Sequence, residues 1–450
     1  MIARRVVRWL DDRLAAAPFA HTTLNRVFPD HFSFLLGEVA LYCFIVLLAT
    51  GTFLAMFFEP SVSEVVYQGS YEPLRGVTMS RAYASVLDIS FEVRLGLLIR
   101  QMHHWASLLF AGSILLHLAR IFFTGAFRRP REINWLVGVG LLVLGLFNGW
   151  AGYLLPGDTL HGTGLRLGYA IALSVPVIGP WLVFLLFGGE YQSPQILSRL
   201  FVAHVYIVPL MILGLISVHM AILWRQKHTQ FRGPGRTQTN VVGEKMWPAY
   251  AAKAGGLFFA VVAVVGLLGG LVQISPVWLY LPDTPAAVTS PAQPDWYFGW
   301  LDGALRVFPA WEIQAFGFEI PAVFFPGVLL PTLSVLLLVM WPFLEARFSK
   351  DTGPHHLLER PRDRPLRSAI GVGLITFYGV LLAAAGNDVY ARTFSVPVLQ
   401  VTNVFRVLTL VLPVVIGFAT FRMLRSLRDR EISRMSEGAV AVAGGAGSDD

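Results

Sequence analysis

The sequence predicts an all-α polytopic membrane protein built as a bundle of eight transmembrane helices. Three observations support this fold class. The 450 residues are 55% apolar and only 14% charged, with a mean hydropathy of +0.60, a composition typical of membrane proteins. Eight apolar runs are long enough to cross a bilayer. Arginine also gathers in alternate segments between these runs, as in proteins that cross a membrane repeatedly.

Each predicted span holds about 20 or more predominantly apolar residues, the length that crosses a hydrocarbon core. The spans are residues 34–58, 95–123, 133–155, 199–224, 254–274, 320–344, 367–386 and 398–421. Two further apolar stretches, 167–187 and 296–309, are interrupted by glycine and proline, so we expect re-entrant or surface helices there. An even number of spans puts both termini on one side of the membrane.

The charged residues predict which side that is. Basic residues cluster in the segments that share a side with the termini: Arg4, Arg5, Arg8, Arg13, Arg128, Arg129, Arg131, Arg225, Lys227, Arg232, Arg236, Lys245, Arg422, Arg425, Arg428 and Arg430. The opposite segments are acidic, with Glu59, Glu64, Glu72, Asp88, Glu92, Asp283, Asp295 and Asp302. Because basic loops stay in the cytoplasm, we expect cytoplasmic termini and a multi-pass protein of the inner or plasma membrane. The net charge of +7 then reflects topology and gives no reason to expect a nucleic-acid partner.

Cysteine usage and the chain ends add further limits. The single cysteine, Cys43, cannot form an intrachain disulfide, hold an iron–sulfur cluster alone or attach a haem covalently, so any such centre lies in a partner. We expect residues 1–33 to be a cytoplasmic segment without a cleavable signal peptide, because it is too charged. The low-complexity end predicts a disordered cytoplasmic tail over 426–450.

Four histidines in two of the predicted spans are the strongest functional signal. His103 and His117 are fourteen residues apart, and His204 and His219 are fifteen apart. At about 100° per residue, each pair faces broadly one way, with an axial rise of roughly 21–22 Å. Two such helices can hold two metal centres at two depths, and imidazole is a common axial ligand of haem iron. The alternative is four isolated core histidines, although ionisable residues inside a membrane are rare and usually functional.

Glycines repeat at the same interval in two neighbouring spans. Gly37 and Gly51 lie in the first span and Gly138 and Gly152 in the third, each pair fourteen residues apart. A glycine lets a flat macrocycle approach the backbone closely, so the matching intervals favour a bundle around two haems. The alternative is that these glycines mediate helix packing.

Three arginines and one proline complete this pattern. Arg100, Arg120 and Arg199 lie within five residues of a histidine and near the ends of their spans, where a guanidinium can pair with haem propionates. Snorkelling to the membrane interface is the alternative for each. Pro209 follows His204 by five residues and predicts a kink in the fourth span.

The first four spans, with their glycine and histidine pairs, resemble cytochrome b of the quinol–cytochrome c oxidoreductases, and spans five to eight match the C-terminal part of that family. The resemblance implies a diheme N-terminal bundle over 34–230, a cytoplasmic linker over 231–253 and a C-terminal part over 254–425. It also implies two non-covalent b-type haems. One would be held by His103 with His204 near the outer face, the other by His117 with His219 near the cytoplasmic face. His104 adjoins His103, so spacing alone decides between these two.

The segment between the fifth and sixth spans contains Pro294, Asp295, Trp296 and Tyr297, in that order. It resembles the PEWY signature of the family's outer quinol-oxidation site, with Asp in place of Glu. Because quinol oxidation releases protons, we expect Asp295 to accept one, with Tyr297 holding the ring. An ordinary loop motif is the alternative. The segment GYLLPGDTLHGTGLRLG resembles the opposite wall of that site and adds Asp158 and His161, whose roles stay open, as does that of Asp302.

Several segments look most similar to actinobacterial cytochrome b: PDWYFGWLDGALRVFPAWE, LLERPRDRP and Gly386-Asn387-Asp388. This likeness implies menaquinol as the donor, a Rieske iron–sulfur partner and a membrane-bound, diheme cytochrome c. A homodimer of the complex is expected, and association with a terminal oxidase stays open. The implied activity sends one quinol electron to the Rieske centre and the other through two haems to an inner quinone, coupled to proton translocation. The inner site is poorly marked, with His21, His228, Glu244, Lys245, His355 and His356 as candidates.

Two other functions remain at this point. A diheme anchor of a dehydrogenase or hydrogenase would share the histidines, but it would not need the PDWY segment or four further spans. A non-haem transporter could carry polar residues in its core and would show no haem spectrum.

Overall fold

The computed structural model describes residues 2–191, 193–284, 293–315 and 317–445. Among them, eight helical segments are long and apolar enough to cross a membrane, which confirms the predicted number. They are α3 (Leu36–Ala55), α5 (Gly96–Phe123), α6 (Glu132–Tyr153), Ile196–Gln226, Met246–Leu271, Phe325–Ser349, α14 (Pro365–Ala384) and the first part of α16 (Val398–Gly445). Each of the eight observed segments begins within about eight residues of the start that the sequence predicts.

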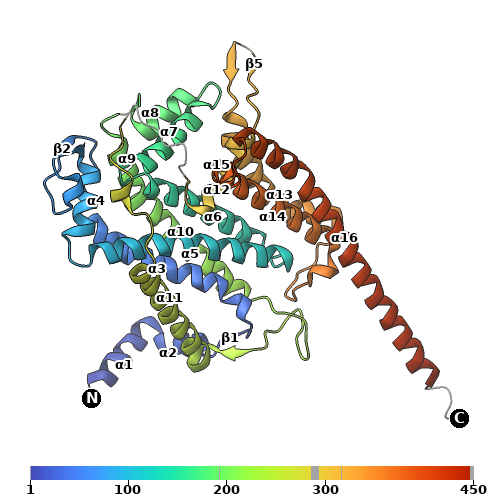
Figure 1. Cartoon of the computed structure of the whole chain (residues 1–450). Helices are drawn as coiled ribbons and strands as arrows, with labels where there is room; N and C mark the ends of the chain where they lie inside the picture. The colour runs from blue at the N-terminus through green and yellow to red at the C-terminus, as the bar shows by residue number, and fades with distance from the viewer. Residues whose placement is uncertain (1, 192, 285–292, 316, 446–450) are drawn as a thin grey trace.

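The spanning helices form two groups, seen on either side of Figure 1. In the first group, α3 packs along α5, α6 packs along α10 (Val208–Gln226), and α11 (Ala251–Leu271) covers α3 and α5. In the second, α14 packs along α16 and α12 (Trp296–Val307), while α13 (Leu330–Ser349) contacts α6. Many large apolar side chains point outward, such as Leu410 and Val414 of α16. That exposure fits helices whose outer faces meet lipid.

The fourth span is irregular just before Pro209, where the sequence predicts a kink. It consists of α9 (Ile196–Val202), a π-helical turn η3 (Ala203–Ile207) and α10. Proline has no backbone N–H, so the regular hydrogen-bond ladder is interrupted one turn before it. His204 therefore lies on the widened turn and His219 on the regular helix.

Surface elements connect the spans at the end that carries the acidic segments. The strand β2 (Glu64–Val66) pairs with β3 (Thr78–Ser80), and α4 (Arg81–Phe91) follows. The apolar stretch at 167–187 forms the end of α7 (Thr159–Leu173) and all of α8 (Gly179–Phe187), and the stretch at 296–309 forms α12. None of these helices is long enough to span a bilayer. The remaining elements here are η2 (Glu72–Leu74), η5 (Val277–Leu279), the hairpin β5 (Ile313–Ala315) and β6 (Phe318–Ile320), and α15 (Asn387–Phe394).

The other end gathers the basic segments. It holds α1 (Ile2–Leu14), α2 (Ala16–Leu24), η1 (Phe32–Phe34), η7 (Pro361–Asp363), and the strand β1 (Val27–Phe28), which pairs with β4 (Glu244–Lys245). The helical turn η4 (Met246–Tyr250) begins the fifth span at this end, whereas η6 (Phe325–Leu329) begins the sixth span at the opposite end, beside α12 and α7. Arg131, only 5% exposed, donates to the backbone oxygens of His355, Gln226 and Lys227. These bonds tie three basic loops together, as an even number of spans requires.

The C-terminal segment differs from the predicted disordered tail. Helix α16 continues to Gly445, and only 446–450 lie outside the described residues. Glu431 pairs with Arg360 at 3.0 Å and with Arg362 at 3.1 Å, and Arg425 lies 3.7 Å from Asp429 one turn on. These pairs and the alanine-rich composition favour helix, so residues 426–445 are helical rather than disordered.

Candidate haem and quinol sites

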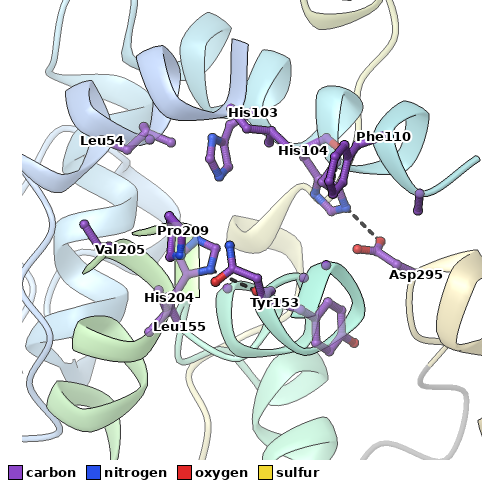
Figure 2. Close-up of a pocket in the computed structure, with 18 of the residues that line it drawn as sticks. Leu54, His103, His104, Phe110, Tyr153, Leu155, His204, Val205, Pro209 and Asp295 are labelled. Carbon is purple, nitrogen blue, oxygen red and sulfur yellow. Dashed lines mark hydrogen bonds and ion pairs between the residues drawn. The ribbon is translucent and has the colours of Figure 1, made fainter. Parts of the chain in front are cut away.

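His103 of α5 and His204 of η3 face each other across the first helix group (Figure 2). Their ring centroids are 6.1 Å apart and their planes are nearly perpendicular, at 81°. Two imidazoles on opposite sides of one metal have ring centres about 6 Å apart, because each metal–nitrogen bond is about 2 Å long. The spacing therefore fits two axial ligands of one iron.

Hydrogen bonds at Nδ1 determine which nitrogen of each ring is left for a metal. The Thr50 hydroxyl donates to the Val46 carbonyl at 2.7 Å, so its oxygen accepts from His103 Nδ1 at 2.9 Å. His204 Nδ1 donates to the Asn148 carbonyl at 2.9 Å. With Nδ1 protonated on both rings, Nε2 carries the lone pair that binds metal.

The inner pair, His117 of α5 and His219 of α10, lacks this support. His117 Nδ1 is buried without a hydrogen-bond partner among the described residues, and His219 Nδ1 has the Asn134 backbone nearby but makes no well-formed hydrogen bond to it. The two histidine pairs are thus alike in spacing along their helices but differ in what holds the rings.

Each predicted glycine lies against one of the four histidines. A Cβ atom at Gly152 would be 2.3 Å from Cε1 of His204, which is closer than any real contact. The same atom at Gly37 or Gly51 would be 3.1 Å from Cε1 of the facing histidine, and at Gly138 it would be 3.8 Å away. The facing residues are His117 for Gly37, His103 for Gly51 and His219 for Gly138. Larger side chains at these positions would fill the space beside the rings, so the cradle fits a planar group held between helices.

Two of the three predicted arginines fit an anionic group near these sites. Arg100 lines the same cavity as His103; its Nη2 donates to the Ser275 carbonyl at 3.0 Å, and its Nε is buried without a partner among the described residues. Arg120 stacks its guanidinium 4.3 Å from the Phe34 ring, and its Nε and Nη2 are likewise buried without partners in that part of the chain. Buried guanidinium N–H groups are costly unless paired, and a carboxylate such as a propionate would satisfy them.

The third arginine is placed differently. Arg199 donates from Nη1 to the carbonyls of Phe184 and Leu185, at 2.8 and 2.6 Å. These carbonyls belong to the last turn of α8, whose orphan acceptors need donors. Arg199 therefore caps a surface helix, and its predicted role beside a haem is not supported by its contacts.

A cavity of about 250 Å³ joins the outer histidine pair to the PDWY segment. His103 and His204 line one part of it, and Asp295 and Tyr297 line another. His104 also lines this cavity, from the same turn of α5 as His103. One apolar space thus connects the two sites that the sequence suggested separately.

Asp295 lies at the N-cap of α12 and is held from two sides. His104 Nε2 is 2.7 Å from Asp295 Oδ1, and the Tyr297 hydroxyl donates to Oδ2 at 3.2 Å. The side chains of His104 and Asp295 are only 18% and 14% exposed. Burial, followed by the charge of Asp295, raises the pKa of Tyr297 well above its ordinary value, so this phenol stays protonated and acts as a donor.

This contact decides between the two neighbouring histidines of α5. His104 turns toward Asp295 (dashed line in Figure 2), whereas His103 turns toward His204. From the sequence, His104 is only an alternative metal ligand, and its place beside the carboxylate was not predicted. Tyr153, which also lines the cavity, was missed as well. The doubled histidine was the available signal for His104.

The rest of the quinol-site motif packs the loop. The Trp296 ring lies against α5, since a Cβ at Gly112 would be 3.6 Å from it. The Tyr297 hydroxyl comes so close to α6 that a Cβ at Gly149 would be 2.7 Å away. Pro294 precedes the N-cap of α12. Asp302, about two turns after the N-cap, pairs with Arg306 at 2.8 Å, and burial raises its pKa.

Asp158 and His161 lie at the start of α7. Asp158 is fully buried and His161 is 2% exposed, and Asp158 Oδ2 is 2.5 Å from His161 Nδ1. His161 lines the same cavity as Asp295.

The candidates for the inner site are scattered. His228 packs against Phe28 and Phe34, and burial with the charge of Arg120 lowers its pKa to about 4. The other candidates pair locally: Glu244 with Lys253 at 2.9 Å, Lys245 with Asn25 at 3.0 Å, His355 with Asp351 at 3.0 Å, and His356 with Arg131 at 3.0 Å, while His21 is exposed on α2. Of these, only His228 lies beside Arg120 and the aromatic rings at this end of the bundle.

Comparisons with known proteins agree with this geometry. Residues 108–282 match the family model described as Cytochrome b(N-terminal)/b6/petB. The chain is 50% identical to the cytochrome bc1 complex cytochrome b subunit of Mycobacterium leprae (strain TN), over 92% of this chain and 75% of that protein. It is 46% identical to the subunit of the same name from Streptomyces coelicolor, over 96% of this chain and 80% of that one.

A solved structure titled Hyperthermophilic respiratory Complex III has the same fold, with a TM-score of 0.67 at 22% identity over 92% of this chain and 99% of that one. The relatives exclude the transporter and the dehydrogenase anchor, since identity of about half extends over nearly the whole chain. The chain belongs to the family of cytochrome b subunits of the cytochrome bc1 complex, the respiratory quinol–cytochrome c reductase, and its relatives of about 50% identity are actinobacterial.

Proposed function

We propose that His103 and His204 hold one b-type haem and that His117 and His219 hold a second, within a diheme bundle over residues 34–230. The facing rings of His103 and His204 and the glycine cradle beside all four histidines support this assignment. When bound, such haems accept and pass single electrons. The chain contributes four Nε2 ligands, and Arg100 and Arg120 supply donors for propionates.

We infer that the outer quinol is oxidised in the cavity beside the first of these sites. Asp295 accepts a proton from the quinol hydroxyl, and His104 and Tyr297 hold the carboxylate in place from its two oxygens. Pro294 and Trp296 fix the loop that carries it. The apolar lining of the cavity suits a quinol ring and tail.

For the inner quinone site we propose the region around His228. This region lies near Arg120, which follows His117 in the last turn of α5. Its support is the aromatic environment, where Phe28 and Phe34 contact the His228 ring and Arg120 stacks on Phe34. Aromatic faces stack on planar rings, and a guanidinium can bond to a quinone oxygen.

The topology proposal follows from charge. The end that carries α1, β1 and the basic loops lies in the cytoplasm of the inner or plasma membrane, so residues 1–33, the linker 231–253 and the tail from 426 are cytoplasmic and the PDWY segment is outside. Residues 254–425 form the C-terminal part of the subunit.

The partners follow from what this chain lacks. Cys43 is buried inside α3, so an iron–sulfur electron acceptor must belong to another subunit. We propose a Rieske protein and a membrane-bound cytochrome c as partners, a homodimeric complex and menaquinol as the donor. Identification of the proteins that co-purify with this chain also tests association with a terminal oxidase.

One observation carries the proposal: two facing histidines line a single cavity with Asp295. Purification in mild detergent, followed by a reduced-minus-oxidised spectrum and identification of co-purified proteins, tests it. We expect two b-type components and a Rieske protein in equal amount. A preparation with one haem, or with two haems and no iron–sulfur partner, would contradict the proposal.

A further inference from the structure

The cavity that Asp295 lines is also lined by His161, which belongs to a second ionisable pair. His161, in the first turn of α7, lines the cavity together with Tyr153, which leads into α7 from the end of α6. The rings of His161 and Tyr153 have centroids 4.4 Å apart. The proposed reaction releases two protons for each quinol, and the assignments above use one acceptor.

The local sequence explains why His161 is held firmly. Asp158 is the N-cap of α7, and its Oδ1 accepts from the backbone N–H of Leu160 at 3.0 Å and of His161 at 3.2 Å. Its Oδ2 accepts from His161 Nδ1. One carboxylate thus caps the helix and orients the imidazole, and an antiparallel bridge to Pro282 holds Asp158 itself.

This arrangement selects the ring nitrogen that can act as a base. Because Nδ1 carries the proton donated to Asp158, Nε2 carries the lone pair. Among the described residues, no hydrogen bond is made to His161 Nε2. The paired carboxylate also stabilises the imidazolium that would form when Nε2 takes a proton.

Other titratable and charged groups lie around this pair. Tyr83 from α4, Arg100 from α5, Tyr153 from α6 and Tyr280 from the segment after η5 all lie within electrostatic reach of Asp158. Asp283 lies against Gly162, the residue after His161, and pairs with Arg166 of α7 at 2.6 Å. Asp295 of α12 lines the same cavity as His161.

We propose that His161 is a second proton-accepting residue of the outer quinol site, an inference that rests on the proposed quinol oxidation. The O–H bond of one quinol hydroxyl breaks and an N–H bond forms at His161 Nε2, while Asp295 takes the proton of the other hydroxyl. The electron pairs of both O–H bonds stay on the quinol oxygens. Two electrons leave the ring for the acceptors of the known reaction, one in an iron–sulfur partner and one in this chain, and quinone remains.

The test uses the purified complex with His161→Gln, which keeps a polar side chain but cannot accept the proton. A general base contributes about 10²- to 10⁴-fold, and a remaining acceptor such as Asp295 or water shrinks this. We expect kcat for quinol–cytochrome c reduction to fall about 10- to 100-fold, KM to change less than about twofold, and both haem bands to keep wild-type intensity. The decrease of kcat at acid pH should also become smaller, because the variant has no imidazole base at this position that acid could protonate.

Asp158→Asn provides a second variant, since asparagine keeps the N-cap but removes the charge that stabilises the imidazolium. Its kcat should fall less than that of His161→Gln, with the acid fall moved to lower pH. The matched control is Asp363→Asn, because Asp363 also accepts from a backbone N–H at the start of a helical turn, η7, at the opposite end of the protein. Its kcat and pH profile should equal those of the wild type.

Unchanged kcat and an unchanged pH profile in assembled His161→Gln would overturn the proposal, as would loss of the outer haem band, which marks a structural role. If His161→Gln does not assemble, an unchanged pH profile in Asp158→Asn overturns it instead. A wild-type complex that carries haem but does not oxidise quinol would refute the proposed function, a separate outcome.

Discussion

The two ends of the proposed diheme bundle share one histidine pattern but surround it differently. At the outer end, both histidine rings are held at Nδ1, by Thr50 and by the Asn148 carbonyl, and their cavity reaches three carboxylate or imidazole side chains, Asp295, His104 and His161. At the inner end, His117 Nδ1 has no such partner in the described part of the chain, His219 has only the Asn134 backbone near it, and the nearby groups are aromatic rings and Arg120.

On the proposed assignment, this difference suits the two haem sites to different steps. Buried acceptors close to a site allow a reaction that releases protons, and hydrogen bonds at Nδ1 raise the basicity of the ligating nitrogen. The inner end has cations that favour binding of an anionic or carbonyl group instead.

Removing an axial ligand at one end should remove the haem at that end and leave the other haem in place. We expect His103→Leu and His204→Leu each to remove the same spectral component and abolish quinol–cytochrome c activity, because one histidine cannot hold a six-coordinate iron. His117→Leu and His219→Leu should remove the other component. Reduced-minus-oxidised spectra measure this, with His104→Gln as the control that keeps both components. If His103→Leu and His219→Leu removed one and the same component, the pairing would be wrong.

Asp295→Asn should affect only the outer end. Asparagine keeps the shape and can still meet His104 and Tyr297, but it cannot take a proton at neutral pH. We expect both haems at normal levels, turnover reduced about 100-fold and a flatter pH profile. Steady-state assays between pH 5.5 and 8.5, run beside haem quantification, provide the measurement. Full turnover with an unchanged profile would remove Asp295 from the reaction.

Thr50→Val should change one haem and spare the other. Valine has the shape of threonine but no oxygen to accept from His103 Nδ1, and loss of such a partner typically costs about 10- to 100-fold in metal affinity or activity. We expect a lower midpoint potential or occupancy for the outer haem alone, measured by redox titration. Thr376→Val is the matched control, since its hydroxyl makes the same bond to a backbone carbonyl without a histidine nearby. Equal shifts in both haems would contradict the contrast between the ends.

The smallest effect concerns His228 at the inner end. Its folded pKa of about 4 lies below the ordinary 6.5, so between these values the unfolded chain binds a proton that the folded chain does not. Stability from this group is therefore present above pH 6.5 and is lost as the pH falls toward 4, by at most about 1.4 kcal/mol per unit. We expect His228→Asn to flatten the fall of the melting midpoint between pH 7 and 5. His21→Gln, an exposed control on α2, should keep the wild-type slope, and an equally steep slope in His228→Asn would refute the assignment.

Much of the fold could be predicted because the bilayer imposes it. A span needs about 20 apolar residues and must make all the hydrogen bonds of its own backbone, so eight helices could be located from composition. Pro209 predicted the irregular turn at η3 for an equally local reason. Arg199 and the C-terminal tail could not be predicted, since the partners of Arg199 are the last carbonyls of α8 and those of Glu431 lie about seventy residues earlier in the chain.

The sequence by itself determined the number of spans, the two histidine intervals, the matching glycines and the place of Asp295 between the fifth and sixth spans. These depend on helical periodicity and on the length of an apolar run, which are local properties. Only the tertiary structure decided how the neighbours His103 and His104 divide their roles. Adjacent residues on a helix point about 100° apart, so the packing of η3 on one side and α12 on the other gave one a facing histidine and the other a carboxylate.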